Sequence, residues 1–445
     1  MDSFPSKELP VHVGQLLADA MEEGEQFGLA PWLQALIASD PDAAPVPVPL
    51  PGAAERTLAL ATIWSEAKYN FAYWDQLPGE AWWDRCFQEY LPPIQAAETE
   101  REYWDLLTRF TRLLDDGHTG IILPHHLRRL DTTPPLRLQD VEGRAVVVEG
   151  ALLPPGTQIL AVDGVPVEEL RTRLEATIES ATDHYTKAAS AARLLSGPRG
   201  TPVTLLARRW DGSEFEVTLQ RTGPLRRPDR VEVTTLGEGR FRVAINSMGE
   251  PEVAEAFHRR FPDFDGVTGL VLDLRRNGGG STEVANSILA RLLTAPAQSE
   301  RTALRTYIPA YRAWGGHQRW LVAPPELVRP DPSRPTFAGP VAVLCGPFTA
   351  SAAEDFLVTF KAAKRGPIVG QPSCGSTGQP LTVPLPGGGA FRVCCKRDTM
   401  PDGEVFVGKG IQPDIPCAPT LAGVASGRDE ALEAAVHYLH DGRNA

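Results

Sequence analysis

The chain has 445 residues, of which 42% are hydrophobic and 22% are charged, so it can bury a full core and should divide into about two to four domains. Its formal net charge of −12 argues against nucleic acid and anionic membranes as partners, because binding to either needs clustered cations. No run of ~18 apolar residues occurs, so no membrane-spanning helix is predicted.

Residues 1–52 are predicted to form a helical preface that ends in a Pro-rich linker. The N-terminus is acidic and lacks the apolar segment of a secretory signal. The cysteines show no Cys-x-x-Cys spacing, which disfavours a zinc site, and nothing else in the sequence indicates a disulfide framework. We therefore expect reduced thiols, a cytoplasmic location and no metal or cofactor.

Residues 53–130 are predicted to form a helical domain whose many aromatic side chains pack into a small core. A lone histidine is usually a surface residue or a satisfied core residue. His118, however, lies between acidic residues and two glycines at the end of a helical segment, which is an uncommon setting for packing. We therefore treat His118 as a candidate catalytic base, since the members of a Ser-His arrangement can be far apart in sequence.

Residues 131–223 alternate short β patterns around one helix near residues 167–178, which predicts a β domain. Residues 224–445 then alternate strands and helices. That order predicts an α/β fold, with a mostly parallel sheet, flanking helices and right-handed crossovers.

Two turns of the α/β domain lie at the carboxyl ends of predicted strands, where open α/β sheets place their sites. The first follows the apolar run 270–274 and contains Gly278, Gly279 and Gly280. Their N–H groups can approach a ligand closely and act as oxyanion-hole donors. The same turn could hold a phosphate, but the Gly-Lys-Ser/Thr ending of a P-loop is absent.

The second turn follows the apolar run 340–345 and places Ser351 at the start of a helical pattern. Such a turn lifts the serine oxygen out of the fold and points the positive end of the helix at negative charge that forms there. A simpler interpretation is that Thr349 or Ser351 only caps the helix, which is a common role for these residues.

Together these segments resemble the C-terminal-processing (tail-specific) serine peptidase family, in the branch similar to the tricorn protease core and the interphotoreceptor retinoid-binding protein modules. The resemblance runs from about residue 57 to residue 418. Four motifs carry it, in the order of the family: Asp116-Gly-His-Thr119, Asp273-Leu-Arg-Arg-Asn-Gly-Gly-Gly280, Thr349-Ala-Ser-Ala-Ala-Glu354 and Gly410-Ile-Gln-Pro-Asp-Ile415.

The resemblance implies a crotonase-like ββα core for the α/β domain. It also implies a PDZ-like domain over residues 131–223, because residues 156–167 resemble the central PDZ hairpin. PDZ domains capture chain ends by adding a strand to a sheet edge.

By the same resemblance, Ser351 is the nucleophile, His118 is the general base, and the N–H groups of Gly280 and Ala352 form the oxyanion hole. Gly279 and Ser376 are assigned to substrate binding.

Two departures from the family pattern affect the expected mechanism. Ser376 stands where the Ser-Lys branch has its lysine, which favours the histidine-based version. Val407 stands where the tricorn-like branch has a glutamate that orients the histidine, and Glu404 lies three residues earlier. Glu404 could reach the site through a shifted loop, Asp115 or Asp116 could orient His118, or the enzyme works without a charged orienting residue.

The predicted function is a serine peptidase that hydrolyses peptide bonds in a peptide or protein substrate. Two alternatives stay open: a non-catalytic binder of an apolar ligand or peptide on the same fold, and a serine hydrolase of small esters or amides. A histidine base of ordinary pKa ~6.5 predicts that activity rises through about pH 6 to 7. Substrate preference and assembly state, a homo-oligomer included, are left open by the sequence.

Overall fold

The structure is a computed structural model, and it describes residues 49–128, 131–223, 228–316 and 319–441. The predicted helical preface and most of the Pro-rich linker therefore lie outside the described residues. In the described ranges, no helix combines the length and hydrophobicity needed to cross a membrane.

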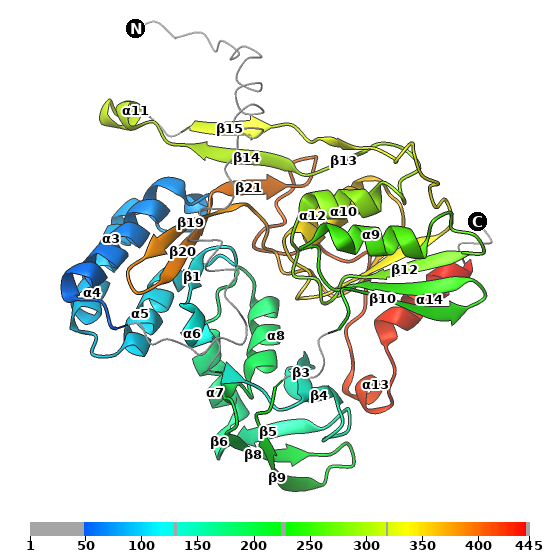
Figure 1. Ribbon diagram of the computed structural model, residues 1–445, viewed down its shortest axis with the longest axis horizontal. Helices are drawn as coiled ribbons and strands as arrows, with labels where there is room; N and C mark the ends of the chain where they lie inside the picture. The colour runs from blue at the N-terminus through cyan, green and yellow to red at the C-terminus, as the bar shows by residue number, and fades with distance from the viewer. Residues whose placement is uncertain (1–48, 129–130, 224–227, 317–318, 442–445) are drawn as a thin grey trace, which may run out of the picture.

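Two fully buried strands form the centre of a six-stranded sheet in the C-terminal half of the chain (Figure 1). The first pair of strands is antiparallel and the following pairs are parallel, so the predicted mostly parallel sheet is present. The strands, in sheet order, are β10 (Val231–Gly237), β11 (Arg240–Ile245), β12 (Gly269–Asp273), β17 (Val341–Cys345), β18 (Ile368–Gly370) and β22 (Ile415–Pro416).

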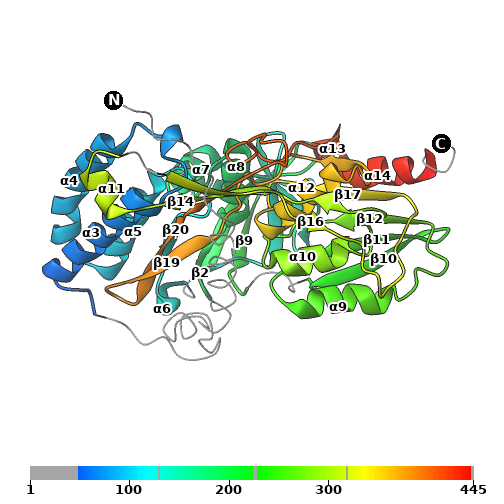
Figure 2. The ribbon, with the colours of Figure 1, turned by 90° about the horizontal axis from the view of Figure 1, so that it is seen from above.

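Helices cover both faces of this sheet (Figures 1 and 2). Successive strand residues point to opposite faces, and strand β12 shows this directly. Leu270 and Leu272 belong to the hydrophobic cluster on one face, whereas Val271 packs with helix α14 on the other. The helices are α9 (Pro251–Arg260), α10 (Thr282–Leu289) and α12 (Ala352–Ala362) on the first face and α14 (Glu430–Asp441) on the second.

The N-terminal helices α3 (Ala53–Asn70), α4 (Glu80–Ala96) and α5 (Glu100–Arg112) share one continuous buried cluster with the first face of the sheet. Helix α5 buries Tyr103, Trp104, Leu107 and Phe110 at helical spacing. It leads to strand β1 (Gly120–Ile122), which pairs with β20 (Gly389–Cys394), and β20 in turn pairs with β19 (Pro380–Leu385). A strand from the C-terminal part thus holds the segment that contains His118.

Residues 131–223 contain a second sheet with its own hydrophobic cluster. Helix α8 (Asp183–Arg193) packs on strand β3 and lies on the side that faces the α/β part (Figure 1). The other elements of this region are β2 (Asp131–Thr132), β3 (Leu136–Val141), β4 (Arg144–Gly150), β5 (Gln158–Val162), β6 (Val165–Pro166), α7 (Val167–Glu175), β7 (Gly197–Pro198), β8 (Pro202–Arg208) and β9 (Glu214–Gln220).

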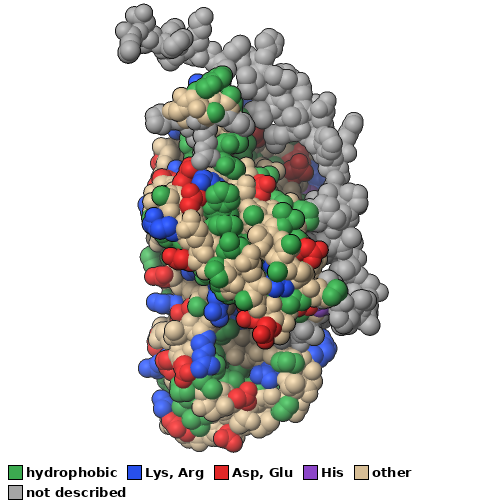
Figure 3. Space-filling view, turned by 90° about the vertical axis from the view of Figure 1, so that its left-hand side faces the viewer, with side chains coloured by type: hydrophobic (Ala, Val, Ile, Leu, Met, Phe, Trp, Pro, Cys, Tyr) green, Lys and Arg blue, Asp and Glu red, His purple; other side chains and the backbone are tan. Residues whose placement is uncertain are grey.

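A long hairpin of β14 (Arg301–Thr306) and β15 (Arg319–Ala323) projects over helix α3, with α11 (Pro309–Ala313) at its tip (Figure 1). Its inner strand pairs with β21 (Lys396–Thr399). The face of the molecule on the side of helices α3 to α5 mixes hydrophobic, acidic and basic side chains, without a large area of one charge sign (Figure 3). The remaining short elements are a 3-10 turn (Trp74–Gln76), α6 (His125–Arg128), β13 (Ala297–Gln298), β16 (Leu327–Val328) and α13 (Leu421–Ala425).

Candidate active site

Ser351 occupies the sharp turn between strand β17 and helix α12. Its φ of 57° and ψ of −130° are unusual for a residue with a side chain, and such backbone strain concentrates at functional turns. N-cap residues normally have extended backbone, so helix capping alone does not account for this conformation. The Ser351 N–H donates to the carbonyl of Ser376 at 3.0 Å, which helps to hold the turn.

The glycine turn lies directly against Ser351. A Cβ atom on Gly279 would stand 2.6 Å from the Ser351 Cβ and 3.0 Å from the Ala352 nitrogen, so only glycine allows this approach. The Gly279 N–H donates to Asn277 Oδ1 at 2.9 Å and the Gly279 carbonyl accepts from Met248. Gly279, which the sequence predicted to bind substrate, is therefore buried and packs against the turn that contains Ser351.

The two predicted oxyanion-hole donors are available. In the described part of the chain, neither the Gly280 N–H nor the Ala352 N–H has a hydrogen-bond acceptor. Met248 bonds to the residues on either side of Gly280, through the Gly279 carbonyl and the Ser281 N–H. The N–H and C=O groups of Gly280 itself therefore point away from Met248. Two free N–H groups next to a strained serine are what an oxyanion hole requires.

His118 is held by a hydrogen bond of 2.6 Å between its Nδ1 atom and Ser376 Oγ. Its loop is shaped by Asp116, whose Oδ2 atom accepts from the His118 N–H at 3.1 Å and from the Thr119 hydroxyl at 2.7 Å. Gly117 makes the contact with Ser376 possible, because a Cβ there would stand 2.6 Å from Ser376 Oγ. Asp116 thus positions the His118 backbone and not its ring.

Ser376 joins the two predicted catalytic residues. It is buried, its hydroxyl contacts the His118 ring, and its carbonyl accepts from the Ser351 N–H. Among the described residues no hydrogen bond links the His118 ring to Ser351 directly. The sequence predicted a substrate-binding role for Ser376, and in the structure its hydroxyl is hydrogen-bonded to the His118 ring.

Glu404 does not have the orienting role predicted for it. Its side chain is exposed, and in the described part of the chain its carboxylate makes no hydrogen bond or ion pair. Asp115 pairs with Arg112 instead of His118, and Val407 is buried in the core. The His118 Nδ1 atom therefore contacts the neutral hydroxyl of Ser376 and not a carboxylate.

Glu354 was not predicted as a site residue, yet its carboxylate binds the backbone of both Ser351 and Ser376. This carboxylate is fully buried and accepts from the Ser373 hydroxyl at 2.6 Å, Gly375 N–H at 2.8 Å and Ser376 N–H at 2.9 Å. It also accepts from the Ser351 N–H at 3.3 Å. Burial raises the pKa of Glu354, and the donors oppose that rise. The signal was a Ser-x-x-Glu capping pattern at the start of an apolar helix.

Replacing Glu354 with glutamine should destabilise the protein and slow catalysis. Each carboxylate oxygen accepts two donors, so the NH₂ group of a glutamine would face two hydrogen donors in either orientation. Leaving buried donors unsatisfied costs ~1–3 kcal/mol each, and we expect Glu354→Gln to lose about 2–4 kcal/mol of unfolding free energy. Thermal unfolding and kcat/KM for peptide hydrolysis measure the two effects.

The matched control is Glu283→Gln, an exposed glutamate in the first turn of helix α10, which should change neither quantity. A Glu354→Gln variant with wild-type stability and activity would contradict the positioning role of Glu354.

Burial and, to a lesser extent, nearby positive charges keep His118 neutral. Burial lowers the pKa of His118 to about 3, and the charges of Arg392 and Lys396 act in the same direction. The ordinary pKa assumed from the sequence is therefore revised downward. Burial lowers the pKa of Lys396, but Asp398, Asp355 and Glu300 outweigh it and raise that pKa above its usual value. Lys396 is therefore a cation beside the site and not a base.

A cavity of about 1000 Å³ lies beside the site, between the β domain and the α/β part. His118, Ser376 and Ala350 line it on the catalytic side. The β domain also contacts the catalytic loop directly: the Thr182 hydroxyl donates to the Cys374 carbonyl at 2.8 Å, and His184 Nε2 bonds to the Ser373 carbonyl at 2.6 Å. Within the described residues, no group of three or more His, Cys, Asp or Glu side chains could hold a metal ion.

The chain is similar to known peptidases. Residues 242–417 match the model of peptidase family S41. A chloroplastic C-terminal processing peptidase of Tetradesmus obliquus is 24% identical over 376 residues, which cover 79% of this chain and 75% of the relative.

Solved structures show the same fold at low sequence identity. The crystal structure of mature CPAF superposes with a TM-score of 0.69 at 17% identity, over 88% of this chain and 98% of that one. A solved structure from Parabacteroides merdae gives a TM-score of 0.55 at 18% identity, over 89% and 99% of the two chains.

The family match and the curated relative define a serine-type peptidase, a hydrolase that acts on peptide or protein substrates. Over residues 242–417 the chain is similar to peptidase family S41.

Proposed function

We propose that the chain hydrolyses peptide bonds with Ser351 as nucleophile and His118 as general base, and that Ser376 orients His118. The observation that carries this proposal is the position of Ser376, whose hydroxyl bonds to His118 Nδ1 while its carbonyl holds the Ser351 N–H. One residue thus fixes both reacting groups relative to each other.

The protonation state of His118 suits a base. When the Nδ1–H group donates to Ser376 Oγ, the lone pair is on Nε2, and the lowered pKa keeps the ring neutral. Nε2 takes the Ser351 proton as the oxygen attacks a peptide carbonyl and then returns it to the leaving amine. Water then hydrolyses the acyl-enzyme, with His118 as base again.

The charge that develops on the carbonyl oxygen is held by the N–H groups of Gly280 and Ala352. Losing one donor of this kind typically costs ~10²–10³ in rate. The N-terminus of helix α12 adds favourable potential. Because Ser376 is neutral, it stabilises the imidazolium less than a carboxylate would, so turnover is slower than that of an enzyme with a Ser-His-Asp triad.

A non-catalytic binder is the main alternative class. The unused Gly280 and Ala352 N–H groups favour the hydrolase, because a binder of apolar ligands has no need of free donors beside a strained serine. Hydrolysis of small esters or amides would use the same groups, and the family match favours peptides.

Labelling with a fluorophosphonate probe tests the proposal. The probe should modify Ser351, as peptide mass spectrometry would show, and the rate should stay nearly constant from about pH 8 to below pH 6, because a lowered pKa keeps the His118 base form present in acid. The acid limit is set by unfolding, since the unfolded chain protonates this histidine near pH 6.5 and the folded one does not.

A steep alkaline rise in labelling rate would indicate a lysine base instead, and absence of labelling would favour the binder. Label on a serine other than Ser351 would contradict the assignment of the nucleophile.

The proposal includes the finer architecture expected from the family. The α/β part is proposed to be a crotonase-like core over residues 224–445, with a helical domain over 53–130 and a PDZ-like domain over 131–223. The free thiols of all six cysteines support a cytoplasmic location. A homo-oligomer is compatible with this proposal.

A further inference from the structure

The cavity beside the catalytic residues contains an arginine that is almost without a partner. Arg276 precedes the glycine turn and lines the cavity. Among the described residues its one ion pair is with Glu149 of strand β4, at 4.0 Å. Its side chain is 43% exposed, so the charge is accessible to a ligand in the cavity.

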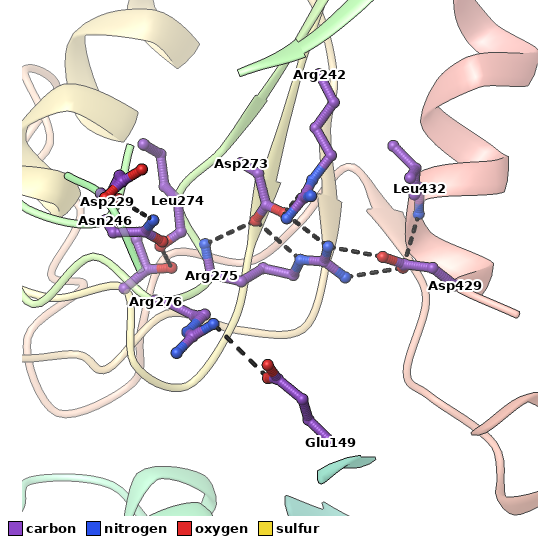
Figure 4. Close-up of polar contacts among 11 residues, drawn as sticks. Glu149, Asp229, Arg242, Asn246, Asp273, Leu274, Arg275, Arg276, Asp429 and Leu432 are labelled. Atoms are coloured by element: carbon purple, nitrogen blue, oxygen red, sulfur yellow. Dashed lines mark hydrogen bonds and ion pairs between the residues drawn. The ribbon is translucent and has the colours of Figure 1, made fainter. Parts of the chain in front are cut away.

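The neighbouring arginine has the opposite environment (Figure 4). Arg275 bonds to Asp273 at 2.7 Å and to Asp429 at 2.8 Å, and Arg242 bonds to Asp273 as well. These guanidinium groups are satisfied and join strands β11 and β12 to the start of helix α14. Figure 4 shows Arg276 pointing away from them, toward Glu149. Arg276 is thus not part of this structural network.

The partner of Arg276 is already in use. Glu149 lies directly opposite Arg137 in the β3–β4 ladder, and Arg137 donates to Glu149 Oε2 at 3.0 Å. Two guanidinium groups therefore share one carboxylate. Burial lowers the pKa of Arg137, and the charges of Arg276 and Arg275 add to this despite Glu149. The group Arg137, Arg276 and Glu149 has one positive charge in excess.

We propose that Arg276, together with Arg137, binds a carboxylate of the substrate peptide, and that Arg276 sets a preference for an acidic residue near the scissile bond. This inference rests on the proposed function. A substrate carboxylate would supply the missing anion and form charge-assisted hydrogen bonds with a planar guanidinium, a geometry that arginine favours.

The distance along the chain limits which substrate residue is involved. Four residues of backbone span at most ~14 Å, so the Cα of Arg276 lies within that distance of Gly280, the proposed oxyanion donor. An extended peptide advances ~3.3 Å per residue. The acidic residue is therefore expected within about four positions of the cleaved bond.

The test uses matched decapeptides with one glutamate or one glutamine placed at each position within about four residues of the cleaved bond. Each peptide is made with a free C-terminal carboxylate and with a C-terminal amide, which separates an acidic side chain from a chain end as the source of the carboxylate. We expect wild type to prefer glutamate at one position by about tenfold in kcat/KM. Arg276→Gln should bring that ratio to about one.

Glu149→Gln should increase the preference, because it removes the competing carboxylate from both arginines. The control is Arg173→Gln, an exposed arginine on helix α7 whose partner is Glu169. It deletes the same charge outside the cavity and should leave the preference unchanged. Raising the salt concentration should weaken the preference of wild type through screening.

Failure of this inference is distinguishable from failure of the proposed function. If wild type cleaves glutamate and glutamine peptides equally, or if Arg276→Gln keeps the preference, the inference is wrong although the peptidase stands. If wild type cleaves no peptide, the carboxylate site is tested by binding alone. Binding of the same peptides to the Ser351→Ala variant is then measured by fluorescence anisotropy. A glutamate preference lost in Ser351→Ala/Arg276→Gln supports the carboxylate site, and equal or undetectable binding contradicts it.

Discussion

Replacing Ser351 with alanine should lower kcat for peptide hydrolysis by about 10⁶-fold, as loss of the nucleophile does in other serine peptidases. The variant should fold normally, because alanine and serine bear the same Cβ strain at the positive φ of this turn. Steady-state kinetics on a cleaved peptide and thermal unfolding check the two parts of this prediction.

The matched control is Ser213→Ala, which removes an exposed hydroxyl from the β8–β9 turn and should leave kcat unchanged. A Ser351→Ala variant that retains more than about 1% of wild-type kcat would show that another group performs the attack.

Replacing His118 with alanine should cost nearly as much, because the ring that Ser376 holds is the proposed acceptor of the serine proton. The two losses should not add, so the Ser351→Ala/His118→Ala double variant should be no slower than either single variant, within about threefold. Kinetics of the two single variants and the double variant measure this directly.

Lys409→Met is the informative comparison, since Lys409 is an exposed lysine and its loss tests whether a lysine serves as the base. It should retain wild-type activity. Loss of activity in Lys409→Met together with an active His118→Ala variant would reverse the assignment.

The two halves of the nucleophile turn could be predicted from the sequence because each follows a strongly apolar strand. Strands β12 and β17 are parallel neighbours, so their carboxyl ends meet at one edge of the sheet and bring the glycine turn to Ser351. The glycine turn and Ser351 could therefore be predicted from two features of the sequence: two buried strands, and a turn directly after each of them.

The orienting residue could not be found in this way. Residues 373–376 form no helix or strand, so no periodicity indicates where the Ser376 side chain points. Its position depends on the buried Glu354 below it and on Gly117 beside it. Glu404 was predicted from spacing within a motif, and spacing along an irregular loop does not determine distance in space.

The sequence predicted a separate helical domain over residues 53–130. In the structure, side chains of this region and of the α/β part share one buried cluster. Hydrophobic periodicity shows that a helix buries one face and does not show what covers it. The β domain differs, since its strands alternate and its cluster is its own.

The pairing of strand β1 with β20 has a consequence for biosynthesis. Gly120 pairs with Arg392, so the ribosome must synthesise the intervening residues before this pair can form, which takes roughly 15–50 s at ~5–20 residues per second. During that time the loop containing His118 lacks both its sheet partner and Ser376. The proposed active site is therefore completed only late in synthesis, after most of the chain has been made.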